Sequence, residues 1–190
     1  HTSSRRQRQM CIRDSCIAGP VVAAAVILKN KLDNLDDSKK LSTKKRDLLS
    51  IKILENSYYG FGIVSNKEID KINILNASLL AMKRAILNLP IKPAMVLVDG
   101  IYKPDLNIPM KTIIGGDSIE DVISAASIIA KVYRDNLMIE YNKKYPDYNF
   151  KKNKGYGTKE HFFAIQQKGI CTIHRTVSYT HLTLPTRRGG

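Results

Sequence analysis

The spacing of apolar residues changes several times along this chain, and each change predicts a new strand or helix. Residues 21–28 (VVAAAVIL) form a continuous apolar run, which is typical of a strand buried on both faces. Residues 58–64 and 94–98 are apolar runs that predict two more strands, and residues 111–114 are a candidate for a short edge strand. The pattern therefore predicts a sheet built from these segments.

Two helices are predicted from capping residues followed by apolar positions at helical spacing. Ser42 can cap a helix that runs to about Glu55. Asn73 can cap a second helix, which Pro90 ends. The inward faces expected for these helices are Leu48, Leu49 and Ile53 in the first, and Leu75, Leu79, Met82, Ile86 and Leu89 in the second.

The second half of the chain predicts two further helices. A long helix is expected from Ser118 to about Tyr145, and a short amphipathic helix over residues 159–168 follows a cap at Thr158 and ends at Gly169. The alternation of strands and helices predicts an α/β fold with a mixed central sheet flanked by helices, in a single domain. The inward face of the long helix is expected to be Ile119, Val122, Ala126, Ile129 and Tyr133.

Composition narrows the class of protein. The 190 residues are 43% hydrophobic, enough for one sizeable core, and no apolar run approaches the ~18 residues that cross a bilayer. The three cysteines form no CxxC pair, so a reducing, cytoplasmic compartment is expected. The net charge of +14 indicates either a polyanionic partner or a lysine-rich solvated surface, and charge alone does not separate the two.

The two ends of the sequence differ from its middle. Residues 1–15 (HTSSRRQRQMCIRDS) and 177–190 (VSYTHLTLPTRRGG) lack the Lys, Asn and Ile bias and the periodicity of residues 16–176. Both resemble translated sequencing-adaptor sequence, although a natural basic arm and tail are the alternative. We therefore expect the folded domain to comprise residues 16–176.

Two carboxylates are candidates for a site of chemistry. Asp99 follows a buried apolar strand, and Asp117 precedes a helix after Gly115-Gly116. Carboxylates meeting in this way can form half of a divalent-cation site. Taken alone, however, an Asp-Gly pair after a strand is more often a turn, and an Asp before a helix is more often a cap.

Six motifs, taken in order, resemble the ribonuclease HII family over about residues 16–176. They are AGP followed by VVAAAVIL (18–28), DSKKL (37–41), VDG (98–100), GDS leading into AASIIAKVYRD (116–135), KGYGTKEH (154–161) and IHR (173–175). A single DG or GDS has little specificity, but the ordered set is specific to this family. The resemblance implies an RNase H-like fold, a monomer, and an endonuclease that cleaves the RNA strand of RNA–DNA hybrids and at ribonucleotides in duplex DNA.

The resemblance also implies roles for individual residues. Four carboxylates would bind two Mg²⁺ or Mn²⁺ ions and yield 5′-phosphate and 3′-hydroxyl products, and Asp99 and Asp117 match the third and fourth of them. Tyr156 matches the tyrosine that packs on the sugar at the RNA–DNA junction, although a tyrosine covering the edge of the core is the alternative. Lys39, Lys40, Lys154 and Lys159 are assigned to phosphate-backbone contacts, although Lys39 and Lys40 are alternatively a solvated lysine pair. His174 and Arg175 are expected to close the fold, with contact to nucleic acid as the alternative.

The sequence departs from the family at its start. Met10 and Cys11 stand where the first two carboxylates belong, and Arg13-Asp14-Ser15 replaces the Gly-Arg-Gly turn that contacts the ribonucleotide 2′-hydroxyl. Neither Met nor Cys replaces a carboxylate as a ligand for a hard cation. We therefore predict that the chain as written is inactive or nearly so. The alternatives are a basic hybrid-binding domain without catalysis and a fragment of ribonuclease HIII.

Overall fold

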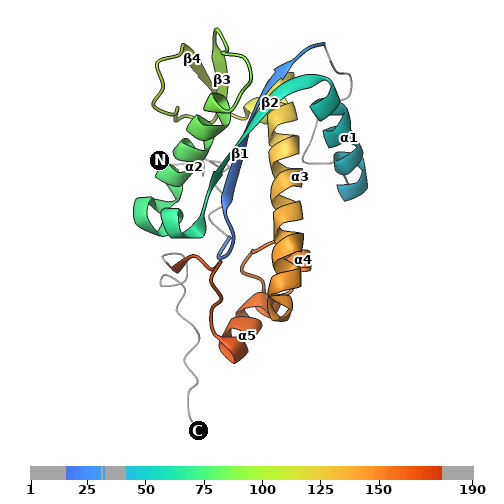
Figure 1. Ribbon diagram of the computed structural model, residues 1–190, viewed down its shortest axis with the longest axis vertical. Helices are drawn as coiled ribbons and strands as arrows, with labels where there is room; N and C mark the ends of the chain where they lie inside the picture. The colour runs from blue at the N-terminus through green and yellow to red at the C-terminus, as the bar shows by residue number, and fades with distance from the viewer. Residues whose placement is uncertain (1–15, 31, 33–41, 177–190) are drawn as a thin grey trace, which may run out of the picture.

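The computed structural model describes residues 16–30, 32 and 42–176, and it confirms the α/β class (Figure 1). In chain order, its elements are β1 (Val21–Leu28), α1 (Thr43–Glu55), β2 (Ser57–Val64), α2 (Asn66–Leu87), β3 (Val96–Asp99), β4 (Met110–Ile113), the 3₁₀ helix η1 (Gly116–Ser118), α3 (Asp121–Lys144), the 3₁₀ helix η2 (Pro146–Tyr148), α4 (Phe150–Asn153) and α5 (Lys159–Lys168). All four predicted strands and all four predicted helices are present.

Three helix starts show which capping predictions were correct. The side chains of Ser42 and Thr158 accept backbone hydrogen bonds at the first turns of α1 and α5, as predicted. Asn73 also caps as predicted, because its Oδ1 accepts from the Asn76 amide at 3.0 Å. It does so from within α2, with φ at 64°, because a further helical segment that the periodicity did not reveal precedes it.

The long helix starts later than predicted. α3 begins at Asp121, and residues 116–118 instead form the separate turn η1, because the backbone of Glu120 is extended. Ile119 therefore lies outside the helix and is 67% exposed, and Leu48 on α1 is 56% exposed. Both were predicted to point inward, and both predictions are wrong.

The strands form two pairs. β1 and β2 are antiparallel, with Val21 opposite Val64 and Leu28 opposite Ser57. β3 and β4 are parallel, with Asp99 opposite Ile113. Among the described residues, no strand joins the two pairs. The predicted mixture of parallel and antiparallel strands is present, but as two separate two-stranded sheets.

Helices cover both faces of β1. Ala24, Val26 and Leu28 pack in a cluster with residues of α1 and α3, whereas Val21 and Ala23 pack in a cluster with residues of α2. Alternate side chains of a strand point to opposite faces, so α2 and α3 lie on opposite sides of this strand. In Figure 1, β1 and β2 run between these two long helices. The continuous apolar sequence of β1 is explained by this two-sided burial.

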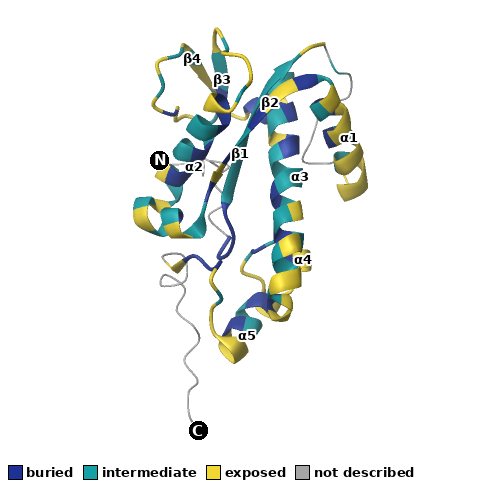
Figure 2. Cartoon of the chain, viewed as in Figure 1, coloured by how far each residue is buried: buried dark blue, intermediate teal, exposed yellow. Residues whose placement is uncertain are grey.

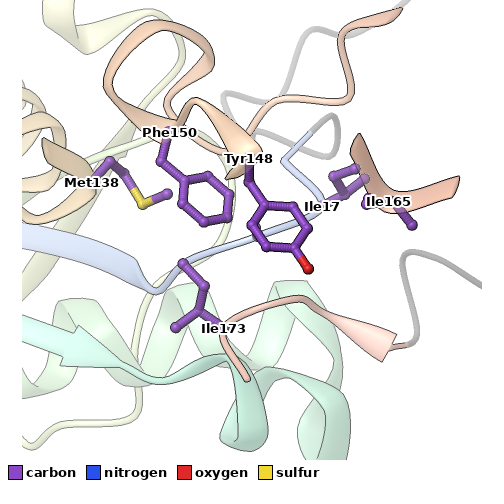
Figure 3. Close-up of a cluster of buried hydrophobic side chains, with 7 residues drawn as sticks. Ile17, Met138, Tyr148, Phe150, Ile165 and Ile173 are labelled. Carbon is purple, nitrogen blue, oxygen red and sulfur yellow. The ribbon is translucent and has the colours of Figure 1, made fainter. Parts of the chain in front are cut away.

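A third cluster of buried side chains closes the C-terminal part of the fold (Figure 3). Its largest members are Met138, Tyr148 and Phe150, which pack with Ile17 and Ile165. Phe150 is fully buried, which contributes about 1.5–3 kcal/mol relative to an exposed ring. This cluster packs the segment after Cys16 against α3, α4 and α5.

Gly62 permits close contact between β2 and α2, and its replacement should be costly. A Cβ at this position would lie 1.8 Å from the Ala81 carbonyl oxygen. We expect Gly62→Ala to lower the free energy of unfolding by about 3 kcal/mol, the upper end for overpacking. Gly115→Ala is the control, because it meets no atom within 4 Å and adds only the strain of a positive φ, about 1 kcal/mol. Urea unfolding measures both, and equal losses would contradict this close-packing account.

Candidate metal centre and the cavity beside it

Asp99 is the last residue of β3, and its side chain joins this strand to the loop before α3. Its Oδ1 accepts a hydrogen bond from the Gly116 amide at 2.9 Å. The Gly100 amide donates to the Ile113 carbonyl at 2.8 Å, so the parallel pairing with β4 continues past Asp99. The carboxylate is therefore held at the carboxyl end of a strand, where polar groups of α/β proteins commonly converge.

Asp117 lies in η1, one residue after the amide that binds Asp99. Asp117 is 4% exposed, and Ser118 Oγ lies 3.4 Å from Asp117 Oδ1. Gly116 allows this approach, because a Cβ there would lie 2.5 Å from Ile123 Cδ1 on α3. The structure thus brings together the two carboxylates that the sequence singled out, on neighbouring elements.

Both carboxylates line one large cavity, of about 840 Å³. Its walls are otherwise mainly apolar and come from β1, α2, β3 and α3. The predicted apolar stripe of α2, including Leu75, Leu79 and Met82, faces this cavity and is only half-buried. The candidate site therefore lies at the margin of a cavity to which strands of both sheets contribute walls.

The described residues do not by themselves complete a metal site. Among them, no group of three or more His, Cys, Asp or Glu side chains is placed to hold a metal ion. Hard cations take six or more oxygen ligands, and a two-cation site needs several converging carboxylates. Asp99 and Asp117 are two suitable donors. The other two positions assigned from the sequence, Met10 and Cys11, lie outside the described residues.

The loop that contains Tyr156 is fixed from both sides. Gly155 has φ of +83°, and a Cβ there would lie 2.4 Å from the Ala18 carbonyl oxygen, so this position requires glycine. The Ile17 amide donates to the Gly155 carbonyl at 2.9 Å, and Tyr156 forms an isolated β-bridge with Cys16. Cys16 in turn lines the cavity. The tyrosine is partly buried and lies beside the cavity wall rather than within that wall.

Two buried arginines hold the segment after Cys16, and sequence reasoning gave a role to only one of them. Arg134 Nε donates to the Pro20 carbonyl and its Nη1 donates to the Lys154 carbonyl. Arg175 Nε donates to the Gly19 carbonyl at 2.9 Å. Burial, together with the charge of Arg134, lowers the pKa of Arg175 to about 10. These contacts favour the predicted fold-closing role of Arg175, and Arg134 was detectable only as the arginine of the VYRD motif.

A chain of hydrogen bonds runs from the Tyr156 carbonyl through two buried histidines. His161 Nδ1 lies 2.8 Å from that carbonyl oxygen and must donate to it. His161 Nε2 therefore accepts from His174 Nε2 at 3.1 Å, and His174 Nδ1 accepts from the Cys171 amide at 2.9 Å. Each ring is neutral in this arrangement. The sequence included both histidines in its motifs, but it gave no sign of their contact.

This histidine pair makes stability depend on pH. Burial lowers the pKa of His161. Burial, together with repulsion from His161 when that ring is protonated, lowers the pKa of His174 to about 4. Unfolded histidine titrates near pH 6.5, so the unfolded state binds more protons between about pH 6.5 and 4. We expect the Tm to fall as the pH is lowered through this range. A His174→Gln variant should have a lower Tm at pH 7 and a flatter pH dependence, and an unchanged slope in calorimetry would contradict the assignment.

The lysines predicted to contact phosphate are only partly described. Lys159 is exposed at the first turn of α5, and Lys154 is partly buried with φ of 52°. Both lie on the sequence that flanks Tyr156. Lys39 and Lys40, like Arg13-Asp14-Ser15, lie outside the described residues.

Comparison with known proteins decides the family. The ribonuclease HII family profile matches residues 14–182. This chain belongs to the ribonuclease HII family. By family it is a metal-dependent endoribonuclease of RNase H type 2, acting on the RNA of RNA–DNA hybrids. Ribonuclease HII of Borrelia duttonii (strain Ly) is 58% identical over 164 residues, covering 84% of this chain and 91% of the relative. That of Thermotoga maritima is 49% identical over 160 residues, covering 84% and 67%.

Solved structures confirm the fold expected for ribonuclease HII. Ribonuclease HII in the PCNA complex from Archaeoglobus fulgidus aligns with a TM-score of 0.70 at 24% identity, covering 85% of this chain and 89% of that chain. Bst-RNase HIII in complex with Mn²⁺ aligns with a TM-score of 0.66 at 16% identity, covering 89% and 64%. At these identities the likeness shows the fold, which is the RNase H-like α/β fold predicted from the sequence. Within the described part of the chain, no helix has the length and apolar character needed to span a membrane.

Proposed function

We propose that Asp99 and Asp117 are the retained half of a ribonuclease HII metal site. We further propose that the enzyme with the complete family motif cleaves at ribonucleotides within duplex DNA as well as in hybrids. The observation that supports this most is the hydrogen bond from the Gly116 amide to Asp99, because Asp117 is the residue after Gly116 and both carboxylates line the same cavity. In a completed site, two Mg²⁺ or Mn²⁺ ions would supply water activation and charge stabilisation, giving 5′-phosphate and 3′-hydroxyl ends.

We further propose that the chain as written is strongly impaired. The described residues offer too few ligands for a hard-cation site, and the sequence has Met10 and Cys11 where the family has carboxylates. The same observation favours the second candidate function for this chain, a basic domain that binds hybrids as a monomer and does not cleave them. Binding without turnover distinguishes this second function from the first.

A panel of labelled substrates tests the proposed substrate class. A version with the family's N-terminal motif restored, defined in the Discussion, is incubated with Mn²⁺ and four duplexes or strands of equal length. Cleavage of the RNA–DNA hybrid and of DNA with one ribonucleotide is expected, the latter on the 5′ side of the ribonucleotide. All-DNA duplex and single-stranded RNA should remain intact. Cutting of all-DNA duplex at a similar rate would contradict the proposal.

Tyr156 is proposed to pack on the sugar at the RNA–DNA junction. In the restored chain, we expect Tyr156→Ala to lower kcat/KM about tenfold, within the range for losing one aromatic stacking partner of a nucleic acid. Tyr156→Phe keeps the ring, so its kcat/KM should stay near that of the restored chain. Tyr58→Ala is the control, because Tyr58 is an exposed tyrosine on β2 and does not belong to the loop that contains Tyr156. Equal effects of Tyr156→Ala and Tyr58→Ala in steady-state assays would contradict this role.

A further inference from the structure

The loop that contains Tyr156 has a backbone conformation that its own residues do not favour. Lys154 has φ of 52° and Gly155 has φ of +83°, so two successive residues are in the left-handed region. That region is costly for any residue other than glycine. Strain of this kind persists only where the surrounding structure fixes the conformation, and it is concentrated at functional sites. The contacts that fix this loop therefore bear on the role of Tyr156.

Side chains from other elements fix the peptide units that precede Tyr156. Arg134 Nη1 on α3 donates to the Lys154 carbonyl at 3.0 Å. The buried Asn153 accepts from the Gly155 amide, with 2.8 Å between the amide nitrogen and Asn153 Oδ1. These two contacts hold the left-handed residues, but neither of them reaches the carbonyl of Tyr156.

The Tyr156 carbonyl is tied to α5 by His161. His161 Nδ1 lies 2.8 Å from this oxygen, and the Thr158 amide donates to the same oxygen at 2.9 Å. The Thr158 bond spans only two residues and sets a local turn. His161 belongs instead to the buried side of α5, whose other side is exposed (Figure 2). The His161 side chain therefore fixes where the turn lies relative to the helix.

His174 fixes the tautomer of His161 that this contact requires. His161 Nδ1 must carry a proton to donate to a carbonyl, so its Nε2 is an acceptor. His174 Nε2 lies 3.1 Å from that nitrogen, and the Cys171 amide donates to His174 Nδ1 at 2.9 Å. His174 therefore carries its proton on Nε2 and donates to His161. The partner of one ring nitrogen thus sets the role of the other.

Aromatic packing holds both imidazole rings in place. The Phe150 ring lies edge-on to His161, with 5.3 Å between the ring centroids. The Tyr148 ring lies 5.0 Å from the His174 ring. Asn66 Nδ2 on α2 donates to the His174 carbonyl at 3.0 Å, which anchors the backbone of this residue. Side chains whose rings are locked by packing can hold a partner at a fixed place.

We propose that His161 and His174 are a positioning pair, which holds the backbone at Tyr156 in the orientation from which the tyrosine ring contacts the substrate. His161 is 0% exposed and His174 is 2% exposed, so both act through Tyr156 and not by touching nucleic acid. The holding of the loop rests on the contacts described above, and only its effect on cleavage rests on the proposed function of Tyr156.

NMR spectroscopy of the chain as written tests the holding of the loop. Nitrogen-15 spectra of the histidine rings at pH 7 should show His161 protonated on Nδ1 and His174 protonated on Nε2, with His161→Asn and His174→Gln assigning the signals. This measurement does not depend on the folding of a more disruptive variant. A proton on His161 Nε2 would overturn the proposal.

A fluorine label at Tyr156 reports the position of the loop. With 3-fluorotyrosine at this position, His161→Leu should shift or broaden the fluorine-19 resonance, because leucine cannot donate to the Tyr156 carbonyl. His161→Asn should restore the resonance, because the asparagine amide supplies a donor close to the place of Nδ1. Circular dichroism confirms that both variants are folded. A resonance that is the same in the parent chain and in His161→Leu would overturn the proposal.

Cleavage by the restored chain separates positioning from a general loss of stability. His161→Leu should lower kcat/KM at least about threefold, and it should cause no further loss when added to Tyr156→Ala, because coupled residues are not additive. His161→Asn should keep most of the activity.

Ile53→Val is the matched control for stability. Ile53 is fully buried in a different cluster, so its replacement should lower the Tm by about 2–4 °C without changing kcat/KM. Independent, multiplying losses from His161→Leu and Tyr156→Ala would overturn the positioning role. A Tyr156→Ala variant as active as the restored chain would instead overturn the proposed function of Tyr156, and the NMR results would still decide whether the pair holds the loop.

Discussion

Restoring the N-terminal motif should raise cleavage of a ribonucleotide-containing duplex by at least about 10³-fold over the chain as written, since losing one group that stabilises transition-state charge already costs about 10²–10³. The restored chain carries Met10→Asp and Cys11→Glu, and Gly-Arg-Gly at residues 13–15. It also has valine and isoleucine in place of residues 4–9, because the cavity beside Asp99 has mainly apolar walls from β1, α2 and β3. Single-turnover rates with Mn²⁺ measure the gain.

A set of partial restorations shows which feature causes this gain. The apolar replacement of residues 4–9 alone should raise the Tm without restoring cleavage, because it adds apolar surface that can be buried but supplies no ligand. The chain with Met10→Asp and Cys11→Glu but with the original residues 4–9 should gain little in Tm and little in cleavage. Rapid cleavage by the chain as written would show that the described carboxylates suffice and that the predicted impairment is wrong.

Asp99→Asn in the restored chain should lower kcat by about 10²–10³-fold, and Asp117→Asn should have a comparable effect. Asparagine keeps the side-chain oxygen that accepts from the Gly116 amide, so the substitution removes charge while it preserves the local geometry. The Tm of Asp99→Asn should therefore stay close to that of the restored chain.

Asp105→Asn provides the matched control for charge. Asp105 is fully exposed beside Lys83 and is not part of the cavity lining, so its replacement should leave kcat unchanged. Salt-matched assays exclude a general effect of net charge on binding to a polyanion. If Asp99→Asn and Asp105→Asn behaved alike, Asp99 would have no special role in catalysis.

Local patterns in the sequence predicted most of the elements because the spacing and capping signals are themselves local. The run of residues 21–28 predicted β1 at its observed bounds, and Thr158 and Gly169 framed α5. The start of α3 was missed because the extended backbone at Glu120 interrupts a pattern that periodicity treats as continuous. Leu48 was wrongly assigned inward because helical spacing alone does not show how much of the α1 surface the neighbouring elements cover.

The candidate site was only partly predictable for a related reason. Asp99 and Asp117 were singled out by their places after a strand and before a helix, and the family motifs gave them roles. The hydrogen bond from the Gly116 amide to Asp99 joins residues far apart in sequence, so no local pattern reveals it. The contact of His161 with His174 depends on tertiary packing and has no local signal. The same holds for Arg134, which donates to the backbone carbonyls of Ala18, Pro20 and Lys154. The cavity was least predictable, because the α2 stripe that lines it has the same periodicity as a stripe packed wholly against other elements.

Direct titration with Mn²⁺ is the measurement that tests the central claim most closely, namely that Asp99 and Asp117 are half of a metal site that an N-terminal strand completes. Isothermal calorimetry at one pH and salt concentration compares the chain as written, the restored chain, and the restored chain with both Asp99→Asn and Asp117→Asn. The account predicts clear Mn²⁺ binding by the restored chain and at least about tenfold weaker binding by the other two, since each lacks two of the carboxylates that a hard cation requires. Binding of equal strength by all three chains would contradict it.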